Sequence, residues 1–307
     1  MRLAECWGRD GIQAERPVRT EDKLAVIAAA GTFGAGRVEV ASFARPQTWP
    51  QFADATEVVA RFDRRPGVDY LVYVPNLRGY QRLASVPGFA ERVDSVLVAI
   101  ASSESYNRKN VRRGTREALA EIDEVVRAAT EDGLKVIGCV GTAWSCPIEG
   151  PVPPAQVVEL VGSLLAAGAT EAMLGDTTGE ADPRTAAALV DLVRTECGVP
   201  LTGHFHDMRG TALANAIAAA GAGADWIDCA LGGIGGHPPD EHQAASAGNL
   251  CTEDFAAVAT SSGLVDGIDL EAALAAGRLA ESVLGRPLLS RVQRSGLPAA
   301  RAPGGPS

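Results

Sequence analysis

The chain has 307 residues, which is long enough for two modest domains or one large barrel. Its 46% apolar and 21% charged residues are typical of a globular protein with a sizeable core, and the net charge of −10 argues against a nucleic-acid partner or an anionic membrane surface. No apolar run approaches the roughly 20 residues that span a bilayer, and the first residues carry no signal-peptide core. We therefore expect a cytoplasmic protein.

Short apolar runs alternate with amphipathic stretches along most of the chain. The predicted strands are Arg2–Cys6, Arg37–Val40, Val68–Val74, Ser95–Ile100, Lys135–Val140, Glu171–Leu174, Pro200–His204 and Trp226–Ala230. The predicted helices include Glu21–Ala30, Ala53–Phe62, Arg113–Ala129, Pro154–Ala167, Pro183–Glu196 and Gly210–Ala220.

Eight strand–helix units over about 260 residues predict an α/β fold of the (β/α)8 TIM-barrel type, with a doubly wound open sheet as the alternative. We expect one catalytic domain over residues 1–287 and a flexible tail over 288–307, where Arg, Pro, Gly and Ser are frequent. The six cysteines are dispersed and form no CxxC pair, which indicates reduced thiols rather than a disulfide framework or a zinc ribbon.

In such a barrel, the residues that follow the strands carry the chemistry. Arg9 and Asp10 come directly after the first strand. They are either an ion pair over a helix start, or an oxygen ligand for a metal (Asp10) beside a fixed positive charge for a substrate oxyanion (Arg9).

Two histidines follow the seventh strand in the sequence Gly203-His204-Phe205-His206-Asp207. Residues two apart on a strand point to the same face, so His204 and His206 can converge on one point. Histidine is the commonest metal ligand, and the pair at a strand end favours a metal site over two structural histidines.

A glycine-rich loop over residues 232–249 follows the eighth strand and contains Gly232, Gly233, Gly235, Gly236 and His237. It lacks the G-x-G-x-x-G spacing of a dinucleotide site. Such a loop is either a flexible connection or a hinge that approaches a ligand closely. All four histidines of the chain lie between His204 and His242, which favours a role in chemistry.

These motifs, in this order, resemble the DRE-TIM metallolyase superfamily, and within it the 3-hydroxy-3-methylglutaryl-CoA (HMG-CoA) lyases. The resemblance runs from about Glu5 to Leu284. It rests on Gly8-Arg9-Asp10-Gly11-Ile12-Gln13, Val38-Glu39-Val40-Ala41-Ser42-Phe43, Val74-Pro75-Asn76-Leu77-Arg78-Gly79, Ser145-Cys146-Pro147-Ile148-Glu149-Gly150, Leu174-Gly175-Asp176-Thr177-Thr178-Gly179, His204-Phe205-His206-Asp207 and Gly248-Asn249-Leu250-Cys251-Thr252-Glu253-Asp254.

The resemblance implies one divalent cation, with Mg²⁺ or Mn²⁺ favoured and Zn²⁺ or Co²⁺ allowed by ligand type alone. The ligands it implies are Asp10, His204, His206 and Asn249. It further implies that Arg9 stabilises an enolate oxygen, that Glu39 holds Arg9 in place, and that Asp176 orients a ligand or Arg9.

The implied activity is a retro-aldol cleavage of an HMG-CoA-like hydroxyacyl thioester. The alternatives are an aldolase or synthase that joins an acyl-CoA enolate to a keto acid in the same fold, and a non-catalytic ligand-binding barrel. The chain departs from the lyases at His237, because they carry a catalytic cysteine there. A histidine exchanges protons near neutral pH and can replace a thiol as acid or base.

Two further features bear on the partners. Arg108 and Lys109 belong to a cationic run after the fourth strand, which either holds the phosphates of coenzyme A or is a solvated loop or helix start. Arg209 follows His206 and Asp207, and either meets a substrate carboxylate or starts the next helix. We expect a small acyl-CoA-like substrate and a homodimer or higher homo-oligomer.

Overall fold

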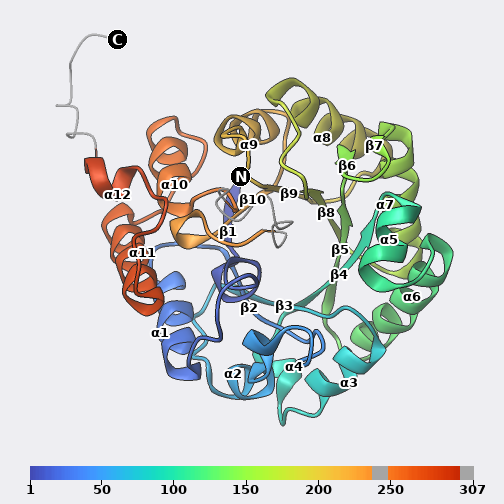
Figure 1. The fold of residues 1–307 in the computed structure, drawn as a ribbon, viewed down its shortest axis with the longest axis horizontal. Coiled ribbons are helices and arrows are strands. Elements are labelled where there is room, and N and C mark those ends of the chain that lie inside the picture. The colour runs from blue at the N-terminus through green and yellow to red at the C-terminus, as the bar shows by residue number, and fades with distance from the viewer. Residues whose placement is uncertain (237–247, 298–307) are drawn as a thin grey trace.

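Eight parallel strands close into a barrel in the computed structural model, which describes residues 1–236 and 248–297 (Figure 1). The strands, in barrel order, are β1 (Arg2–Glu5), β10 (Trp226–Cys229), β9 (Leu201–Phe205), β8 (Glu171–Asp176), β5 (Lys135–Gly141), β4 (Ser95–Ala101), β3 (Asp69–Tyr73) and β2 (Arg37–Ser42). The pairing of β1 with β10, from Arg2 opposite Trp226 to Glu5 opposite Cys229, closes the cylinder. The TIM-barrel prediction is therefore confirmed, and the open sheet is excluded.

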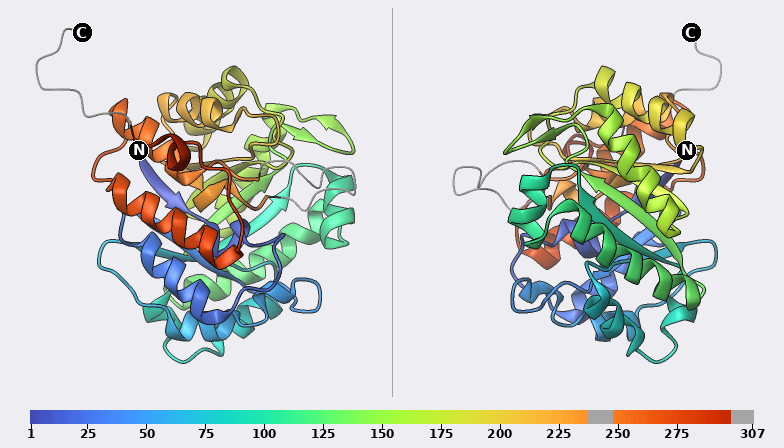
Figure 2. Two further views of the ribbon diagram at one scale, coloured as in Figure 1. Left: turned by 60° about the vertical axis from the view of Figure 1, so that its left-hand side comes forward. Right: turned by 90° about the vertical axis from the view of Figure 1, so that its right-hand side faces the viewer.

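Helices surround the barrel on its outside (Figures 1 and 2). They are α1 (Thr20–Ala30), α2 (Ala55–Arg61), α3 (Leu77–Ala84), α4 (Phe89–Arg92), α5 (Glu104–Val111), α6 (Thr115–Glu131), α7 (Pro154–Ala167), α8 (Pro183–Cys197), α9 (Ala212–Gly221), α10 (Thr252–Ser261), α11 (Leu270–Leu284) and α12 (Val292–Ser295). Shorter elements are the π-helix η1 (Trp7–Gly11), the 3₁₀ helices η2 (Pro50–Phe52) and η3 (Leu231–Gly233), and the antiparallel hairpin of β6 (Ser145–Cys146) and β7 (Gly150–Pro151). None of the helices in the described ranges is long and apolar enough to cross a bilayer.

Two sequence-based expectations can be compared with the structure at this level. Arg108 and Lys109 of the cationic run lie on α5, whose N-cap Ser103 accepts a hydrogen bond from the Tyr106 N–H, so the run belongs to a helix, which was one of the two structures expected for it. The expected tail from residue 288 is wrong for its first part, because Leu288 is buried and Ser290 donates a hydrogen bond to Asp254 on α10. Residues 298–307 lie outside the described residues.

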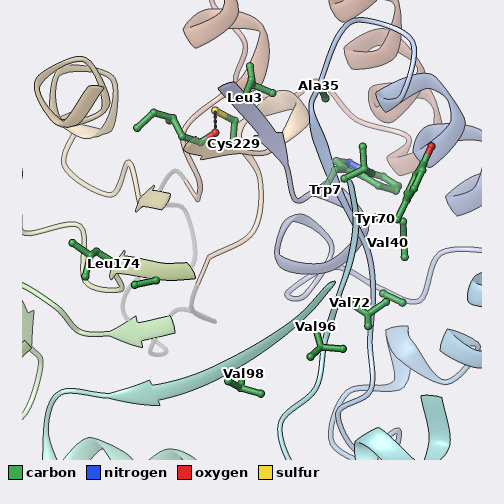
Figure 3. Packing of buried hydrophobic residues seen from close by; sticks show 14 of the residues in the cluster. Leu3, Trp7, Ala35, Val40, Tyr70, Val72, Val96, Val98, Leu174 and Cys229 are labelled. Atoms are coloured by element: carbon green, nitrogen blue, oxygen red, sulfur yellow. Dashed lines mark hydrogen bonds between the residues drawn. The ribbon is translucent and has the colours of Figure 1, made fainter. Parts of the chain in front are cut away.

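Two apolar cores support the barrel. The larger one fills the space between the strands and the helices, and Figure 3 shows part of it, including Leu3, Trp7, Val72 and Leu174. The smaller one lies inside the cylinder and consists of Leu71, Leu97, Ile137 and Met173. Side chains alternate between the two faces of a strand, so these residues fill the inside of the barrel along β3, β4, β5 and β8, and the polar interior residues lie above and below them.

The amino-terminal end of the barrel is closed by a buried ion network. Arg37 donates to both carboxylate oxygens of Glu171, at 2.6 and 2.9 Å, and to Asp69 at 3.0 Å. Thr202 donates to Glu171 at 2.7 Å, and Ser95 donates to Asp69. Each charge in this network has a partner, as burial requires, and the chemistry is left to the opposite end of the barrel.

Candidate metal centre

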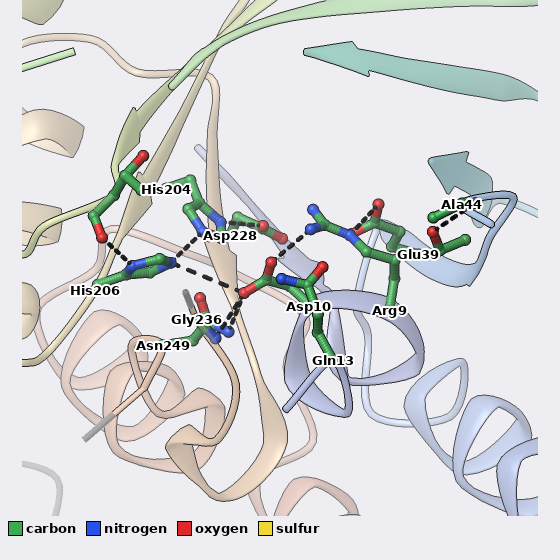
Figure 4. A network of polar contacts seen from close by, with 12 residues as sticks. Arg9, Asp10, Gln13, Glu39, Ala44, His204, His206, Asp228, Gly236 and Asn249 are labelled. Atoms are coloured by element: carbon green, nitrogen blue, oxygen red, sulfur yellow. Dashed lines mark hydrogen bonds and ion pairs between the residues drawn. The ribbon is translucent and has the colours of Figure 1, made fainter. Parts of the chain in front are cut away.

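Two imidazoles meet at the carboxyl end of β9. His204 lies on the strand and His206 follows it, both are buried, and their Nε2 atoms are 2.9 Å apart (Figure 4). The residues are two apart on an extended backbone, so both side chains project into the barrel mouth. The predicted convergence of the two histidines is confirmed by this contact.

The other nitrogen of each ring is already engaged. His204 Nδ1 is 2.6 Å from the Asp228 carboxylate on β10, and His206 Nδ1 is 2.9 Å from the backbone carbonyl of Thr177 after β8. Both partners are acceptors, so they place the proton on Nδ1 and direct the lone pair of Nε2 toward the shared point. This is the arrangement found in histidines that bind a metal.

Asp10 completes the group from the end of β1, which is separated from β9 only by β10. It lies on η1, where Gly8 allows the chain to pack against β2, because a Cβ at Gly8 would lie 2.6 Å from the carbonyl oxygen of Glu39. The Asp10 Oδ2 atom is 3.8 Å from His206 Nε2. Ligand atoms of Asp10, His204 and His206 all lie within 4.8 Å of one another, which is close enough for them to share one ion.

Asn249 contributes from the far end of the glycine-rich loop. Its Nδ2 donates to Asp10 Oδ2 at 2.8 Å, while its buried Oδ1 has no hydrogen-bond partner among the described residues. The N–H of Gly236 also donates to Asp10 Oδ2, at 2.9 Å. Gly235 lies so close to η1 that a Cβ there would be 2.1 Å from the Asp10 carbonyl oxygen, so glycine is required where the loop covers Asp10.

Arg9 is held beside this group by two carboxylates. Its Nε donates to Glu39 on β2 at 2.8 Å, and its Nη1 donates to Asp10 Oδ1 at 2.5 Å. The second oxygen of Glu39, Oε2, is buried without a hydrogen-bond partner within the described part of the chain. Glu39 thus contacts Arg9 as the resemblance implied, and the guanidinium keeps further N–H donors for another ligand.

The charges of the site shift the pKa values of its members. Burial would raise the pKa of Asp10, but Arg9 and the two imidazoles outweigh it and hold that pKa well below its usual range. Burial lowers the pKa of His204, yet Asp228 reverses this effect and the net shift is upward. Burial raises the pKa of Glu39 to about 7 despite the neighbouring Arg9. Asp10 is therefore an anionic ligand at neutral pH.

The donor set fits a hard or borderline divalent cation. A carboxylate, two imidazoles with pinned Nδ1 atoms and an unpartnered amide oxygen converge in one buried place, and an orphaned buried oxygen such as Asn249 Oδ1 is costly unless a ligand satisfies it. Cys6, His204 and Asp228 form a second group whose ligand atoms lie within 4.8 Å of one another. The short contact between His204 and Asp228 gives Asp228 the role of orienting that ring.

Comparison with known proteins identifies the family of this chain. A family model described as HMGL-like matches residues 1–280. The chain belongs to the HMGL-like family. Its relatives in that family include a hydroxymethylglutaryl-CoA lyase of Bacillus subtilis, 33% identical over 94% of this chain and 95% of the relative. A 3-hydroxy-3-isohexenylglutaryl-CoA/hydroxymethylglutaryl-CoA lyase of Pseudomonas aeruginosa is 33% identical over 96% of each chain.

Solved structures of HMGL-like proteins share the whole fold. An HMG-CoA lyase from Acinetobacter baumannii, in complex with coenzyme A and 3-methylmalate, superposes with a TM-score of 0.88 at 30% identity and covers 99% of this chain and 98% of its own. The Bacillus subtilis HMG-CoA lyase gives a TM-score of 0.89 at 32% identity, over 96% of this chain and 97% of its own. The resemblance drawn from the motifs is therefore confirmed at the level of the family.

Other predicted residues of this HMGL-like chain lie outside the central group or outside the described residues. The Asp176 carboxylate, whose pKa burial raises to about 6, accepts hydrogen bonds from the N–H groups of Glu180 and Ala181. Arg108 is exposed on α5 and pairs with Glu104 at 2.7 Å, and its neighbour Lys109 is also exposed. His237 lies outside the described residues.

Three functional neighbours escaped the sequence analysis. Asp228, which orients His204, stands within an apolar strand, and a lone carboxylate in such a run is the signal that could have revealed it. Tyr73 and Cys139 end up near Arg9 inside the barrel, but their sequence context, an ordinary buried strand, gives no sign of this. Arg209, which the sequence analysis did single out, lies before α9 rather than on it, donates to the carbonyls of Thr178 and Gly179 and pairs with Glu180 at 3.1 Å.

Proposed function

We propose that this chain is a divalent-metal-dependent carbon–carbon lyase that cleaves a 3-hydroxyacyl thioester of the HMG-CoA kind, with Asp10, His204, His206 and Asn249 as the ligands of the cation. The observation that carries the proposal is the pair of His204 and His206 Nε2 atoms turned toward Asp10, with each Nδ1 held by an acceptor. Mg²⁺ or Mn²⁺ suits this mixture of oxygen and imidazole donors.

The cleavage balances without an added oxidant or reductant. The bond between the carbon that bears the hydroxyl and the α-carbon of the thioester breaks, the hydroxyl proton leaves to a base, and the carbinol carbon becomes a ketone. The electron pair goes to the thioester fragment as an enolate, which takes a proton at its α-carbon. When bound, a divalent cation acidifies the hydroxyl as a Lewis acid.

The protein's own residues then act on the charge that develops. Arg9 presents N–H donors to the enolate oxygen, and its hydrogen bonds to Glu39 and Asp10 fix the guanidinium before the reaction begins. Asp228 keeps the His204 ring in one tautomer and orientation. Asp176, bound to two backbone N–H groups, holds the turn after β8, and Thr177 of this turn fixes His206.

Several finer assignments belong to the same proposal. His237 is the proposed proton donor to the enolate, on the strength of its place in the sequence motif, and it lies outside the described residues. Coenzyme A is the proposed carrier of the acyl group, with Arg108 and Lys109 as contacts for its phosphates because both are exposed on α5. We also propose a cytoplasmic homo-oligomer.

The test is a cleavage assay with purified protein. The protein is treated with EDTA, reloaded with Mg²⁺, Mn²⁺, Zn²⁺ or Co²⁺, and incubated with HMG-CoA, and acetoacetate and acetyl-CoA are quantified by mass spectrometry. We expect both products in equal amounts, and only after a divalent ion is restored. Equal turnover in EDTA, or condensation of acetyl-CoA with a 2-oxo acid in the absence of any cleavage, would overturn the proposal.

A further inference from the structure

Above the apolar residues inside the barrel, one half of the wall carries one large side chain and three small ones. Interior positions recur every second residue along a strand, so the positions that follow Leu71, Leu97, Ile137 and Met173 on their own strands are Tyr73, Ala99, Cys139 and Gly175, which form the upper layer of this half of the wall. Tyr73, Ala99 and Cys139 are partly exposed, although the residues on either side of them in β4 and β5 are buried. This layer therefore faces the open mouth of the barrel.

Tyr73 lies against the face of Arg9. The carbon at the centre of the guanidinium is 5.2 Å from the centroid of the tyrosine ring, which is within the range of a cation–π contact. Glu39 and Asp10 accept hydrogen bonds from the guanidinium N–H groups, and the Tyr73 ring lies on a side of the guanidinium that neither carboxylate occupies. An acyl group bound by Arg9 on this side of the guanidinium would lie beside Tyr73.

The opposite part of the layer offers little bulk. A Cβ built on Gly175 would meet the Cys139 sulfur at 3.8 Å and the Gly141 Cα at 3.5 Å, which are ordinary van der Waals distances. The side of the mouth formed by β5 and β8 is thus lined by one thiol and by backbone. Burial raises the pKa of Tyr73 to about 12, so this wall is an uncharged phenol at neutral pH.

We propose that Tyr73 is a specificity-determining residue that contacts the acyl part of the substrate and limits the size of the substituent on the carbon that bears the hydroxyl. The inference rests on the proposed function, since it places that carbon between the metal ligands and Arg9. Tyr73 is the largest side chain of its layer and contacts Arg9 directly. Its size therefore sets the space beside the reacting carbon, while Ala99, Cys139 and Gly175 leave the other side open.

The test compares HMG-CoA with a matched thioester that carries a longer hydrocarbon chain in place of the methyl group. For each variant, kcat/KM is measured for both compounds, and so is Kd by calorimetry on EDTA-treated protein, where binding proceeds without turnover. We expect Tyr73→Leu to shift both ratios toward the longer chain by about tenfold or more, since a single methylene in an apolar pocket is already worth about tenfold. Tyr73→Phe keeps the ring and should leave both ratios near the wild-type values.

A second tyrosine provides the matched control. Tyr80 on α3 packs its ring against Phe89 and donates its hydroxyl to Asp132, far from the metal ligands in the barrel mouth. Tyr80→Leu should lower the melting temperature and leave the ratios of kcat/KM and of Kd for the two thioesters unchanged. Unchanged ratios in Tyr73→Leu, or equal shifts in Tyr73→Leu and Tyr80→Leu, would overturn the role of Tyr73. If the wild-type protein cleaves neither thioester, the proposed function fails, while the Kd ratio still decides the role of Tyr73.

Discussion

The two ends of the barrel each contain a buried polar cluster, and the clusters differ in how completely their atoms are paired. At the amino-terminal end, Arg37 is bound by Glu171 and Asp69, and Thr202 and Ser95 supply the remaining donors. At the carboxyl-terminal end, Asn249 Oδ1 and Glu39 Oε2 have no partner among the described residues. A saturated network stabilises the fold, whereas an unsaturated one is costly and points to a missing ligand.

Two strands, β2 and β9, contribute a residue to each of the two clusters. β2 carries Arg37 and Glu39, and β9 carries Thr202 and His204, each pair two residues apart on the interior face. On β3, β4, β5 and β8 the apolar residues Leu71, Leu97, Ile137 and Met173 lie between the two ends, while on β2 and β9 the two clusters are held apart by the partners that each charge already has. One cylinder can therefore hold a structural ion network and a reactive site, and the comparison predicts opposite responses to mutation at the two ends.

The largest effect should come from removing a ligand at the reactive end. Asp10→Ala should abolish metal binding and cleavage, because it deletes the anionic ligand, and it should also lower the melting temperature, because Arg9, Asn249 and Gly236 lose their shared acceptor. Elemental analysis of the metal content and the cleavage assay provide the measurement. Stoichiometric metal retained in both Asp10→Ala and His204→Ala would contradict the ligand assignment.

The opposite response is expected at the structural end. Arg37→Met leaves Glu171 and Asp69 buried without their cation, and breaking such a network costs about 3–5 kcal/mol of unfolding free energy. Denaturant unfolding measures the loss, and the metal content of the folded fraction should stay stoichiometric. If Arg37→Met lost metal as readily as it lost stability, the two ends would not be independent.

A variant of Arg9 tests whether this guanidinium stabilises the negative charge that develops on the enolate oxygen. Arg9→Met should lower kcat by about 10²–10³-fold, the usual loss when a donor to a developing oxyanion is removed, with a smaller change in KM. Arg209→Met is the control, because that guanidinium is half exposed and is engaged by the carbonyls of Thr178 and Gly179. Equal losses of kcat in both variants would remove the special role of Arg9.

A variant of Asp228 tests whether this carboxylate orients the proposed metal ligand His204. Asp228→Asn should weaken metal affinity by about 10–100-fold, because the carboxylate that holds His204 in its binding orientation is lost. A metal titration monitored by calorimetry measures this change. Asp225→Asn, directly before the same strand and bound to the Leu201 N–H, should leave the affinity unaltered.

The smallest expected effect concerns the buried carboxyl group of Glu5. It lies near the reactive end but is saturated, since it accepts from Trp7, Leu231 and Thr252. Burial raises its pKa from 4.5 to about 8. Between pH 4.5 and about 8, this carboxyl group is ionised in the unfolded chain but protonated in the folded protein. Glu5 therefore makes the free energy of unfolding fall as the pH rises through this range.

Glu5→Gln should therefore flatten the pH dependence of the melting temperature between pH 4.5 and 8 and leave the metal content unchanged. Thermal unfolding at several pH values measures this dependence. A melting temperature that varies with pH as steeply in Glu5→Gln as in the wild type would contradict the assignment of the proton to Glu5.

Local pattern was enough to predict the barrel and part of its site. The strand and helix periods follow from the spacing of the apolar residues along the chain. The two-residue spacing of His204 and His206 puts both side chains on one face of their strand, wherever that strand lies in the fold. Arg9, Asp10 and Asn249 were found because short motifs carry them. The contact of Arg9 with Glu39 is the one that the resemblance implied.

The tertiary structure alone decided which other side chains join them. Asp228, Tyr73 and Cys139 reach the site because closing the cylinder brings β10, β3 and β5 around the same mouth, and pairing between strands far apart in the chain leaves no mark on the local sequence. Whether a buried carboxylate is saturated, as in Glu171, or left with a free oxygen, as in Glu39, likewise depends on neighbours that only the folded chain supplies. Composition and periodicity thus determined the scaffold, since they act within single elements, while the reactive group depends on distances across the barrel.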